Sequence, residues 1–277
     1  MNIILILLKV INVVLFFFLV KKYFHKFFTT IFLTILFIIS PWQTQINQEN
    51  ILIALFLSIL FFLIVTHKKD ALNLKYLLIV FLLLFLPSLF LITNKLPRRN
   101  KFQAKNTPLS LNQESIAHII HYQNILNPLN PVFSRLYTNK ATEIVKNLEI
   151  NFFETFNLNY YFFANHPLER VGVKETEKLY SGLLPLFILG LVSLNSVLFL
   201  PTIFWIIVAS LISSLFNNRI YNIQILLFVP FLLLIGIGLE KILKLPVLWK
   251  KIIILGPILI WLIVEIIVLG LNQNLYF

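Results

Sequence analysis

The chain has 277 residues, of which 59% are hydrophobic, only 12% are charged and none is cysteine. A soluble domain carries about 25% charged residues, so this composition excludes a soluble globular enzyme, and its Leu, Ile and Phe content excludes a disordered chain. Without cysteine there is no disulfide, thiolate metal site or cysteine nucleophile. The composition indicates a membrane protein that crosses the bilayer several times.

Eight apolar runs have the length of membrane-spanning segments, and charged or turn-forming residues bound them. A span needs about 20 apolar residues, and its backbone groups must bond within the segment, so we expect helices rather than strands. The predicted spans are 2–20, 27–42, 50–66, 75–93, 179–196, 199–216, 220–239 and 252–271. We therefore expect an all-α integral membrane protein with about eight transmembrane helices. Its predicted parts are 1–93 with the first four helices, an insert at 94–178, and 179–277 with the last four.

The placement of basic residues predicts how these helices are oriented. Three short connections together carry ten Lys or Arg residues: 21–26, 67–75 and 240–251. The two alternate connections carry only Arg219: 42–50 and 217–222. Since basic loops stay on the cytoplasmic side, we expect both termini and the insert to lie outside. This pattern and attraction to membrane lipids account for the net charge of +12, so we expect no nucleic-acid partner.

The insert at 94–178 is expected to form amphipathic helices. Ser110 and Gln113 have the spacing of a helix-capping pair, and Pro128 and Pro131 end the helix that would follow. Between Phe133 and Phe163, apolar residues recur at helical spacing with charges between them, which predicts an amphipathic helix on the membrane surface. We interpret the insert as a lid or groove wall rather than a separate enzymatic domain.

Three stretches, taken in order, resemble the GT-C class of membrane glycosyltransferases, in particular bacterial relatives of protein mannosyltransferases and aminoarabinose transferases. Residues 40–48 (SPWQTQINQ) are similar to the family's Ser-Pro-Trp-His…Ser-Arg stretch. The second stretch runs from RLYTNK at 135–140 to YFFANHPLER at 161–170, with GLLPL at 182–186 opening the next span. The third is NRIY at 218–221, followed by PF at 230–231 and GIGL at 236–239. The resemblance covers most of the chain, from about residue 10 to the end.

The resemblance implies transfer of a sugar from a polyprenyl-phosphate carrier on the outer face of a bacterial cytoplasmic membrane. The acceptor hydroxyl then needs a general base, and the phosphate leaving group needs cations such as arginine. For these roles we select Glu49 as the catalytic base and a set of residues that bind the phosphate or the sugar: Arg219, Arg170, His166, Trp42 and Tyr221. These residues also have simpler interpretations. Arg219 could be an arginine at the membrane interface, and Arg170 and Glu49 could lie in solvated loops. Trp42 and Tyr221 could belong to the belt of aromatic residues at the membrane interface.

The chain departs from the family pattern at its catalytic segment. The family's usual acidic base follows a first span, whereas this chain begins at what resembles the next span, so we expect that loop to be absent. The only aspartate is Asp70, predicted to be cytoplasmic, while Gln43 and Gln48 replace the motif's His and Arg. A partner chain that supplies the acidic loop is therefore a second hypothesis, with this chain as a non-catalytic subunit. A lipid-linked sugar transporter is a third, disfavoured by the lack of internal repeats.

Two further groups of ionisable residues lie outside the three stretches. Glu114, His118 and His121 fall on one helical face, which fits either a divalent cation site or a solvated helix face; no other metal site or cofactor is expected. Lys9 and Glu265 are the most deeply placed charges in predicted spans, each about seven residues from its outer end. Since charges within a membrane tend to pair, we expect an ion pair between them.

Overall fold

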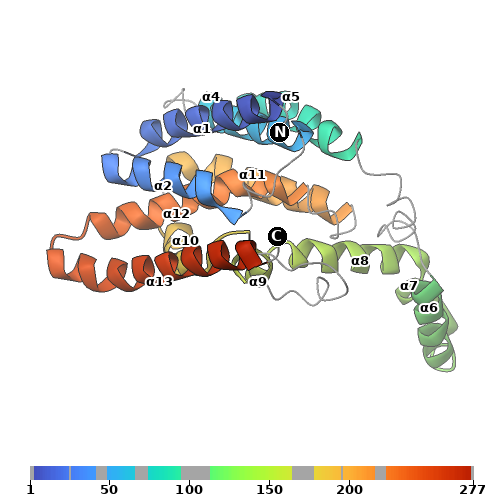
Figure 1. Cartoon of the computed structure of the whole chain (residues 1–277). Coiled ribbons are helices and arrows are strands. Elements are labelled where there is room, and N and C mark those ends of the chain that lie inside the picture. The colour runs from blue at the N-terminus through green and yellow to red at the C-terminus, as the bar shows by residue number, and fades with distance from the viewer. Residues whose placement is uncertain are drawn as a thin grey trace. The chain divides into compact units, whose positions relative to one another are not determined.

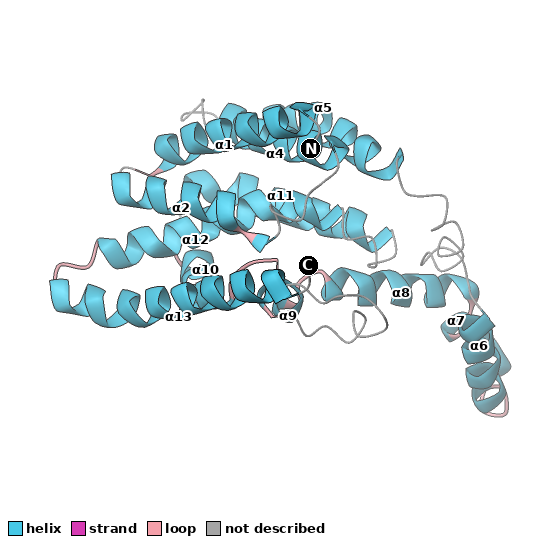
Figure 2. Cartoon of the chain, viewed as in Figure 1, coloured by secondary structure: helices cyan, strands magenta, loops and turns pink. Residues whose placement is uncertain are grey.

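The computed structural model describes residues 3–24, 26–41, 49–65, 74–94, 113–163, 178–194, 196–215 and 223–275, and no strand occurs among them (Figure 2). The α-helices are α1 (Ile3–Tyr23), α2 (Phe27–Ile39), α4 (Glu49–Val65), α5 (Leu74–Asn94), α6 (Gln113–Leu126), α7 (Pro131–Tyr137), α8 (Lys140–Glu154), α9 (Leu158–Phe162), α10 (Leu184–Val192), α11 (Ser196–Leu215), α12 (Phe228–Leu243) and α13 (Leu248–Leu275). Two 3-10 helices, η2 (Ser181–Leu183) and η3 (Ile223–Leu227), precede α10 and α12. The predicted all-α class is confirmed.

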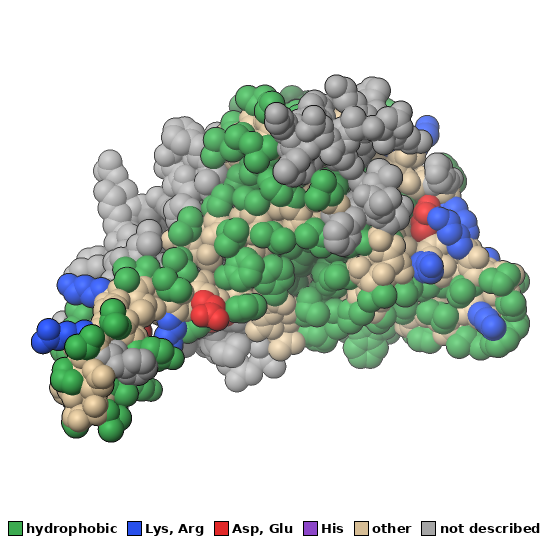
Figure 3. Space-filling model, turned by 180° about the vertical axis from the view of Figure 1, so that it is seen from behind, with side chains coloured by type: hydrophobic (Ala, Val, Ile, Leu, Met, Phe, Trp, Pro, Cys, Tyr) green, Lys and Arg blue, Asp and Glu red, His purple; other side chains and the backbone are tan. Residues whose placement is uncertain are grey.

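Among the described residues, three helices are long and apolar enough to cross a membrane: Ile3–Tyr23, Ile225–Leu243 and Leu248–Val268. The other apolar stretches found among the described residues are shorter: Phe27–Ile39, Ile51–Val65, Leu78–Ser88, Ser181–Val192 and Leu200–Leu215. Apolar side chains also cover broad areas of the described surface (Figure 3). A surface of this kind is stable in lipid and not in water, so the helices indicate a membrane protein.

The chain forms two compact units. The first comprises Met1–Asn94, Leu158–Ile206 and Ile225–Phe277, and the second comprises Lys95–Asn157 and Ile207–Gln224. The first unit therefore holds all three of the long apolar helices.

Helix α12 is the buried centre of the first unit. In its apolar window 89% of residues are buried, against 28% in α1 and 22% in α13. It packs against α10 and α2, and α13 also contacts it (Figure 1). Helices α1 and α13 pack against other helices along a smaller part of their surface. Many of their Ile and Val side chains are therefore exposed.

Two glycines allow α10 and α12 to approach closely. A Cβ atom at Gly190 would lie 1.8 Å from the carbonyl oxygen of Leu234, and one at Gly238 would lie 2.0 Å from that of Leu186. Small residues at such crossings let helix backbones touch, which is a common way to join helices in a membrane. The second glycine belongs to the GIGL sequence and Leu186 to the GLLPL sequence, so this contact joins two stretches that carry the family resemblance.

Basic side chains meet helix C-termini at one end of the first unit, here called the basic end. The Lys26 amine donates to the carbonyl oxygen of Leu243 at the end of α12 (2.5 Å), and the Lys22 amine donates to that of Leu63 near the end of α4 (3.5 Å). A cation at a helix C-terminus satisfies carbonyls that have no partner in the helix and complements the helix dipole. The contact also brings the lysine-rich segments 21–26 and 240–251 together.

The prediction of a single amphipathic helix between Phe133 and Phe163 is wrong in its extent. The segment forms α7, α8 and α9, because Asn139 begins a new helix: its side chain accepts from the Thr142 N–H, and the Thr142 hydroxyl oxygen accepts from the Asn139 N–H. This capping box satisfies two backbone groups at the start of α8. The predicted break near Pro128 and Pro131 is confirmed, since α6 ends at Leu126 and α7 begins at Pro131.

We predict that Gly190→Ala lowers the free energy of unfolding by about 1–3 kcal/mol, because the added methyl group must push α10 away from α12. Gly256→Ala is the matched control, since a Cβ there would meet nothing within 4 Å and alanine favours a helix by about 0.5–1 kcal/mol. Reversible unfolding in mixed detergent micelles measures both. Equal stability of the two variants would show that the α10–α12 contact is not as close as described.

Candidate functional site

A set of hydrogen bonds at the far end of α2 from Lys26 joins segments that are distant in sequence. The Ser40 hydroxyl donates to the carbonyl oxygen of Lys178 (3.0 Å), and the Tyr180 hydroxyl donates to that of Ile39 (2.7 Å). The N–H groups of Lys178 and Leu179 both donate to the carbonyl oxygen of Tyr161, at 3.1 and 2.8 Å. This group of residues, here called the junction, ties the end of α2 to α9 and to the chain entering η2.

Lys178 lies inside the junction and is only 5% exposed. Its amine is 3.7 Å from the centre of the Tyr160 ring, where a cation is attracted by the negative face of the aromatic ring. Burial raises the pKa of the neighbouring Tyr161 phenol, so that hydroxyl stays neutral. The junction therefore contains a buried lysine amine next to aromatic rings.

Aromatic rings continue from the junction into the helices. The ring centroids of Tyr161 and Phe231 are 4.9 Å apart, as are those of Phe187 and Phe231, and those of Phe162 and Phe187 are 5.4 Å apart. Aromatic pairs at these distances add to the stability given by burial alone. Because Phe231 lies on α12 and Phe187 on α10, the α9 rings are packed directly onto the close helix pair.

A second polar cluster, here called the Glu265 clamp, holds α13 to the start of η2. The Glu265 carboxylate accepts from the N–H of Ser181 (3.1 Å), from the N–H of Gly182 (3.0 Å) and from the Ser181 hydroxyl. The Ser181 oxygen in turn accepts from the Trp261 indole N–H (2.9 Å). The first N–H groups of a helix have no partner within it, so the carboxylate fills this need.

The predicted ion pair between Lys9 and Glu265 is wrong. The clamp satisfies Glu265 with three neutral donors, and no ion pair between the two residues forms although both are described. Its charge within an apolar segment identified Glu265 as unusual. Its partners could not be predicted, because no sequence pattern relates position 265 to Ser181, which lies 84 residues away. Lys178 and the junction were also not predicted, because a lysine next to an expected loop gives no indication that it will be buried.

Of the predicted catalytic and binding residues, only Glu49 lies within the described residues. It begins α4 and is partly exposed, a position where a carboxylate complements the helix dipole. The other five lie outside the described residues: Arg219, Arg170, His166, Trp42 and Tyr221. Their roles stay predictions, as does that of Glu49.

In the second unit, His118 contacts α8. Its Nδ1 is 3.2 Å from a Glu143 carboxylate oxygen, and the Lys146 amine is 3.4 Å from its Nε2. Both ring nitrogens are thus engaged by protein groups. No group of three His, Cys, Asp or Glu side chains able to hold a metal ion occurs among the residues searched, and the Glu114 side chain lies outside those described, so a cation on Glu114, His118 and His121 stays a prediction.

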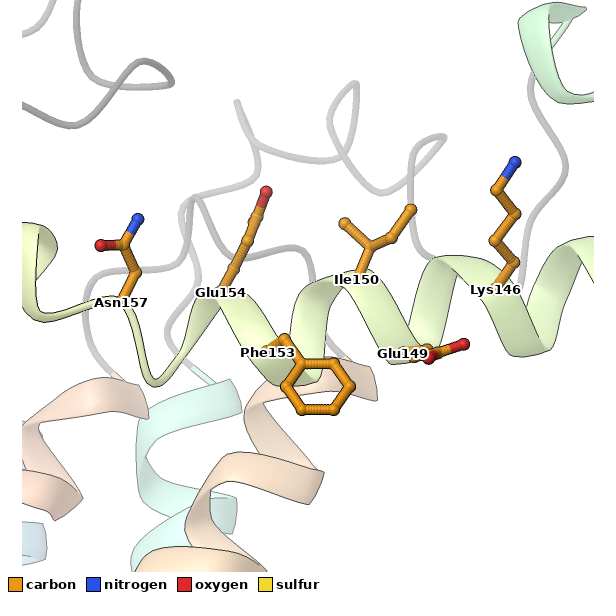
Figure 4. Close-up of a pocket in the computed structure, with 6 residues that line it drawn as sticks. All are labelled: Lys146, Glu149, Ile150, Phe153, Glu154 and Asn157. Atoms are coloured by element: carbon orange, nitrogen blue, oxygen red, sulfur yellow. The ribbon is translucent and has the colours of Figure 1, made fainter.

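A pocket of about 650 Å³ opens along α8, lined by Lys146, Glu149, Ile150, Phe153, Glu154 and Asn157. Lys146, Ile150 and Glu154 project to one side of the helix and Phe153 to the other (Figure 4). The pocket is lined by an aliphatic, an aromatic and several charged or polar side chains.

Comparison with known proteins found no matching family model, no similar curated protein and no similar solved structure.

We predict that Ser181→Ala lowers the free energy of unfolding by about 1–3 kcal/mol, because the Trp261 N–H loses its acceptor and Glu265 loses a donor in an apolar setting. Ser193→Ala, at the other end of α10, is the control, since its hydrogen bonds come from the backbone. Unfolding in detergent compares the two, and a Ser181 variant as stable as the Ser193 variant would mean that the clamp contributes nothing.

Proposed function

We propose that this protein has eight spanning helices and transfers a sugar from a polyprenyl-phosphate carrier to an acceptor on the outer face of a bacterial cytoplasmic membrane. The proposal combines the resemblance of three stretches to GT-C glycosyltransferases with the way those stretches contact one another. The five shorter apolar helices complete the eight spans by local thinning of the bilayer.

The contact network around the junction is the observation that carries this proposal. Ser40, from the first stretch, bonds to Lys178, whose N–H bonds to Tyr161 in the second stretch. The Tyr161 ring packs on Phe231 in the third stretch. Segments 138 and 70 residues apart in the chain are thus connected at one end of the first unit, as a shared binding site requires.

The basic end supports the proposed orientation. It lies at the opposite end of α2 from the junction, since Lys26 precedes that helix and Ser40 follows it. Lysine-rich segments remain on the cytoplasmic side, so the junction faces outward. A carrier that presents its sugar on the outer leaflet then meets the junction directly.

The reaction that we propose is a single displacement. The acceptor hydroxyl oxygen attacks the anomeric carbon, the bond from that carbon to the phosphate oxygen breaks, and the polyprenyl phosphate leaves with the electron pair. Glu49 takes the acceptor proton, while Arg219 and Arg170 stabilise the charge that develops on the phosphate. His166, Trp42 and Tyr221 contact the sugar.

We predict that Glu49→Gln lowers the rate of transfer by about 10²–10⁴-fold, the usual contribution of a general base, and leaves carrier binding unchanged. Arg219→Ala weakens carrier binding. The control is Glu240→Gln, at the basic end. The assay uses purified protein in liposomes with a radiolabelled polyprenyl-phosphate sugar and an extract of envelope lipids and glycans as acceptor.

Three results would contradict the proposal. Glu49→Gln with full activity would remove Glu49 from the mechanism. Labelled sugar that crosses the liposome membrane without joining an acceptor would identify a transporter instead. Transfer that appears only after a second membrane chain is added would identify this chain as a partner subunit.

A further inference from the structure

The basic end combines the positive charge of two segments that are far apart in the chain. The amine of Lys26 donates to a carbonyl group at the end of α12, which places segment 21–26 beside segment 240–251. Together these segments carry seven lysine residues and one acidic residue. Segment 67–75, which follows α4 in the chain, adds three lysine residues and one aspartate. The excess of positive charge is therefore a property of the sequence that the fold concentrates at one place.

Contacts within the protein compensate little of this charge. The carboxylate of Glu240 is 3.2 Å from the Lys244 amine, and one carboxylate can compensate only one of the seven ammonium groups. The lysine amines of segment 21–26 bond to carbonyl groups, which carry only partial charges. Lys250 and Lys251 lie in the first turn of α13, where the helix dipole favours anions over cations. Since like charges close together repel, an anion lowers the free energy of this arrangement.

The lysines of the basic end lie at the level expected for lipid headgroups. All seven are in the short connections that follow the first and the seventh predicted spans, and none lies within a span. Five of their side chains are exposed: Lys21, Lys22, Lys241, Lys244 and Lys250. This end of the first unit lies at the right of Figure 3, where lysine and apolar side chains share the surface. A headgroup at the membrane face can thus reach the amines.

Apolar side chains next to the lysines favour a lipid over a soluble anion. Phe27 and Phe28 at the start of α2 are exposed, as are Leu248, Trp249 and Ile252 at the start of α13. Each of these groups is adjacent in sequence to a lysine of the basic end. An acyl chain can lie along them while its headgroup meets the amines, and tryptophan is a residue enriched at this depth of the membrane.

We propose that the basic end binds an anionic phospholipid of the phosphatidylglycerol type. The phosphate oxygens accept hydrogen bonds from lysine amines of both segments, and hydrogen bonds between charged groups are stronger than those between neutral ones. A zwitterionic phospholipid carries an ammonium group that the same lysines repel, so it binds less tightly. The bound lipid thereby connects segment 21–26 with segment 240–251. This inference does not depend on the proposed sugar transfer.

Binding of acyl-labelled fluorescent phosphatidylglycerol and phosphatidylethanolamine to the purified full-length protein in detergent tests the proposal. Fluorescence polarisation reports the dissociation constant of each lipid. We expect phosphatidylglycerol to bind roughly ten-fold more tightly, in line with the attraction of clustered lysines to anionic lipids. Combined substitution Lys21→Gln, Lys241→Gln and Lys250→Gln should abolish this preference, and arginine at the same three positions should retain it.

A matched variant separates a defined site from general attraction to a basic protein. Arg135→Gln, Lys140→Gln and Lys146→Gln, combined in the second unit, remove the same number of positive charges and should retain the preference. An equal loss of preference in both triple variants would overturn the site. Glycerol phosphate should displace the labelled lipid poorly, and displacement equal to that by a short-chain phosphatidylglycerol would identify a site for soluble anions instead.

The salt dependence of binding to the wild-type protein gives a test that needs no variant to fold. The preference for phosphatidylglycerol should largely disappear at about 1 M salt, where the screening length is about 3 Å. Equal affinity for the two lipids at low salt, or a preference that persists at high salt, would contradict binding through the lysine amines.

Discussion

A polar group among apolar helices is costly to leave without a hydrogen-bond partner, and this constraint shapes how the described helices of the first unit are joined. Specific hydrogen bonds join its described helices. The Asn12 amide donates to the carbonyl oxygen of Leu52 (2.9 Å) between α1 and α4, Lys26 meets the end of α12, and Glu265 receives the first N–H groups of η2. Between these points the helices are held by close packing, most tightly at Gly190 and Gly238.

The same constraint separates two kinds of chemistry at the two ends of α2. Lysines gather where helix C-termini present carbonyl groups, as at Leu243. At the other end, hydroxyl groups, the buried Lys178 amine and aromatic rings surround the chain that enters η2. An end with solvated lysines suits anchoring at a membrane face, whereas an end with buried polar groups suits recognition of a ligand. The proposed sugar transfer uses the second end.

The sequence predicted the helices well because long apolar runs leave few alternatives, and each predicted run contains an apolar helix. It did not predict which side chains meet. Glu265 was singled out for its charge, yet its partners are backbone N–H groups of Ser181 and Gly182, which every residue type carries. The division of the surface segment at Asn139 depends on a local capping box that helical periodicity does not reveal. Glu49 was selected as the proposed base because it is the only acidic residue of segment 42–50, and no contact indicates this role.

The direction in which the first unit crosses the membrane is the central claim, and cysteine labelling in intact cells measures it most directly. The natural chain has no cysteine, so each variant carries a single thiol. An impermeant maleimide should label Asn272→Cys from outside, and should label Lys21→Cys and Lys244→Cys only after the cells are opened. Labelling of Lys244→Cys in intact cells would place the basic end outside and contradict this orientation.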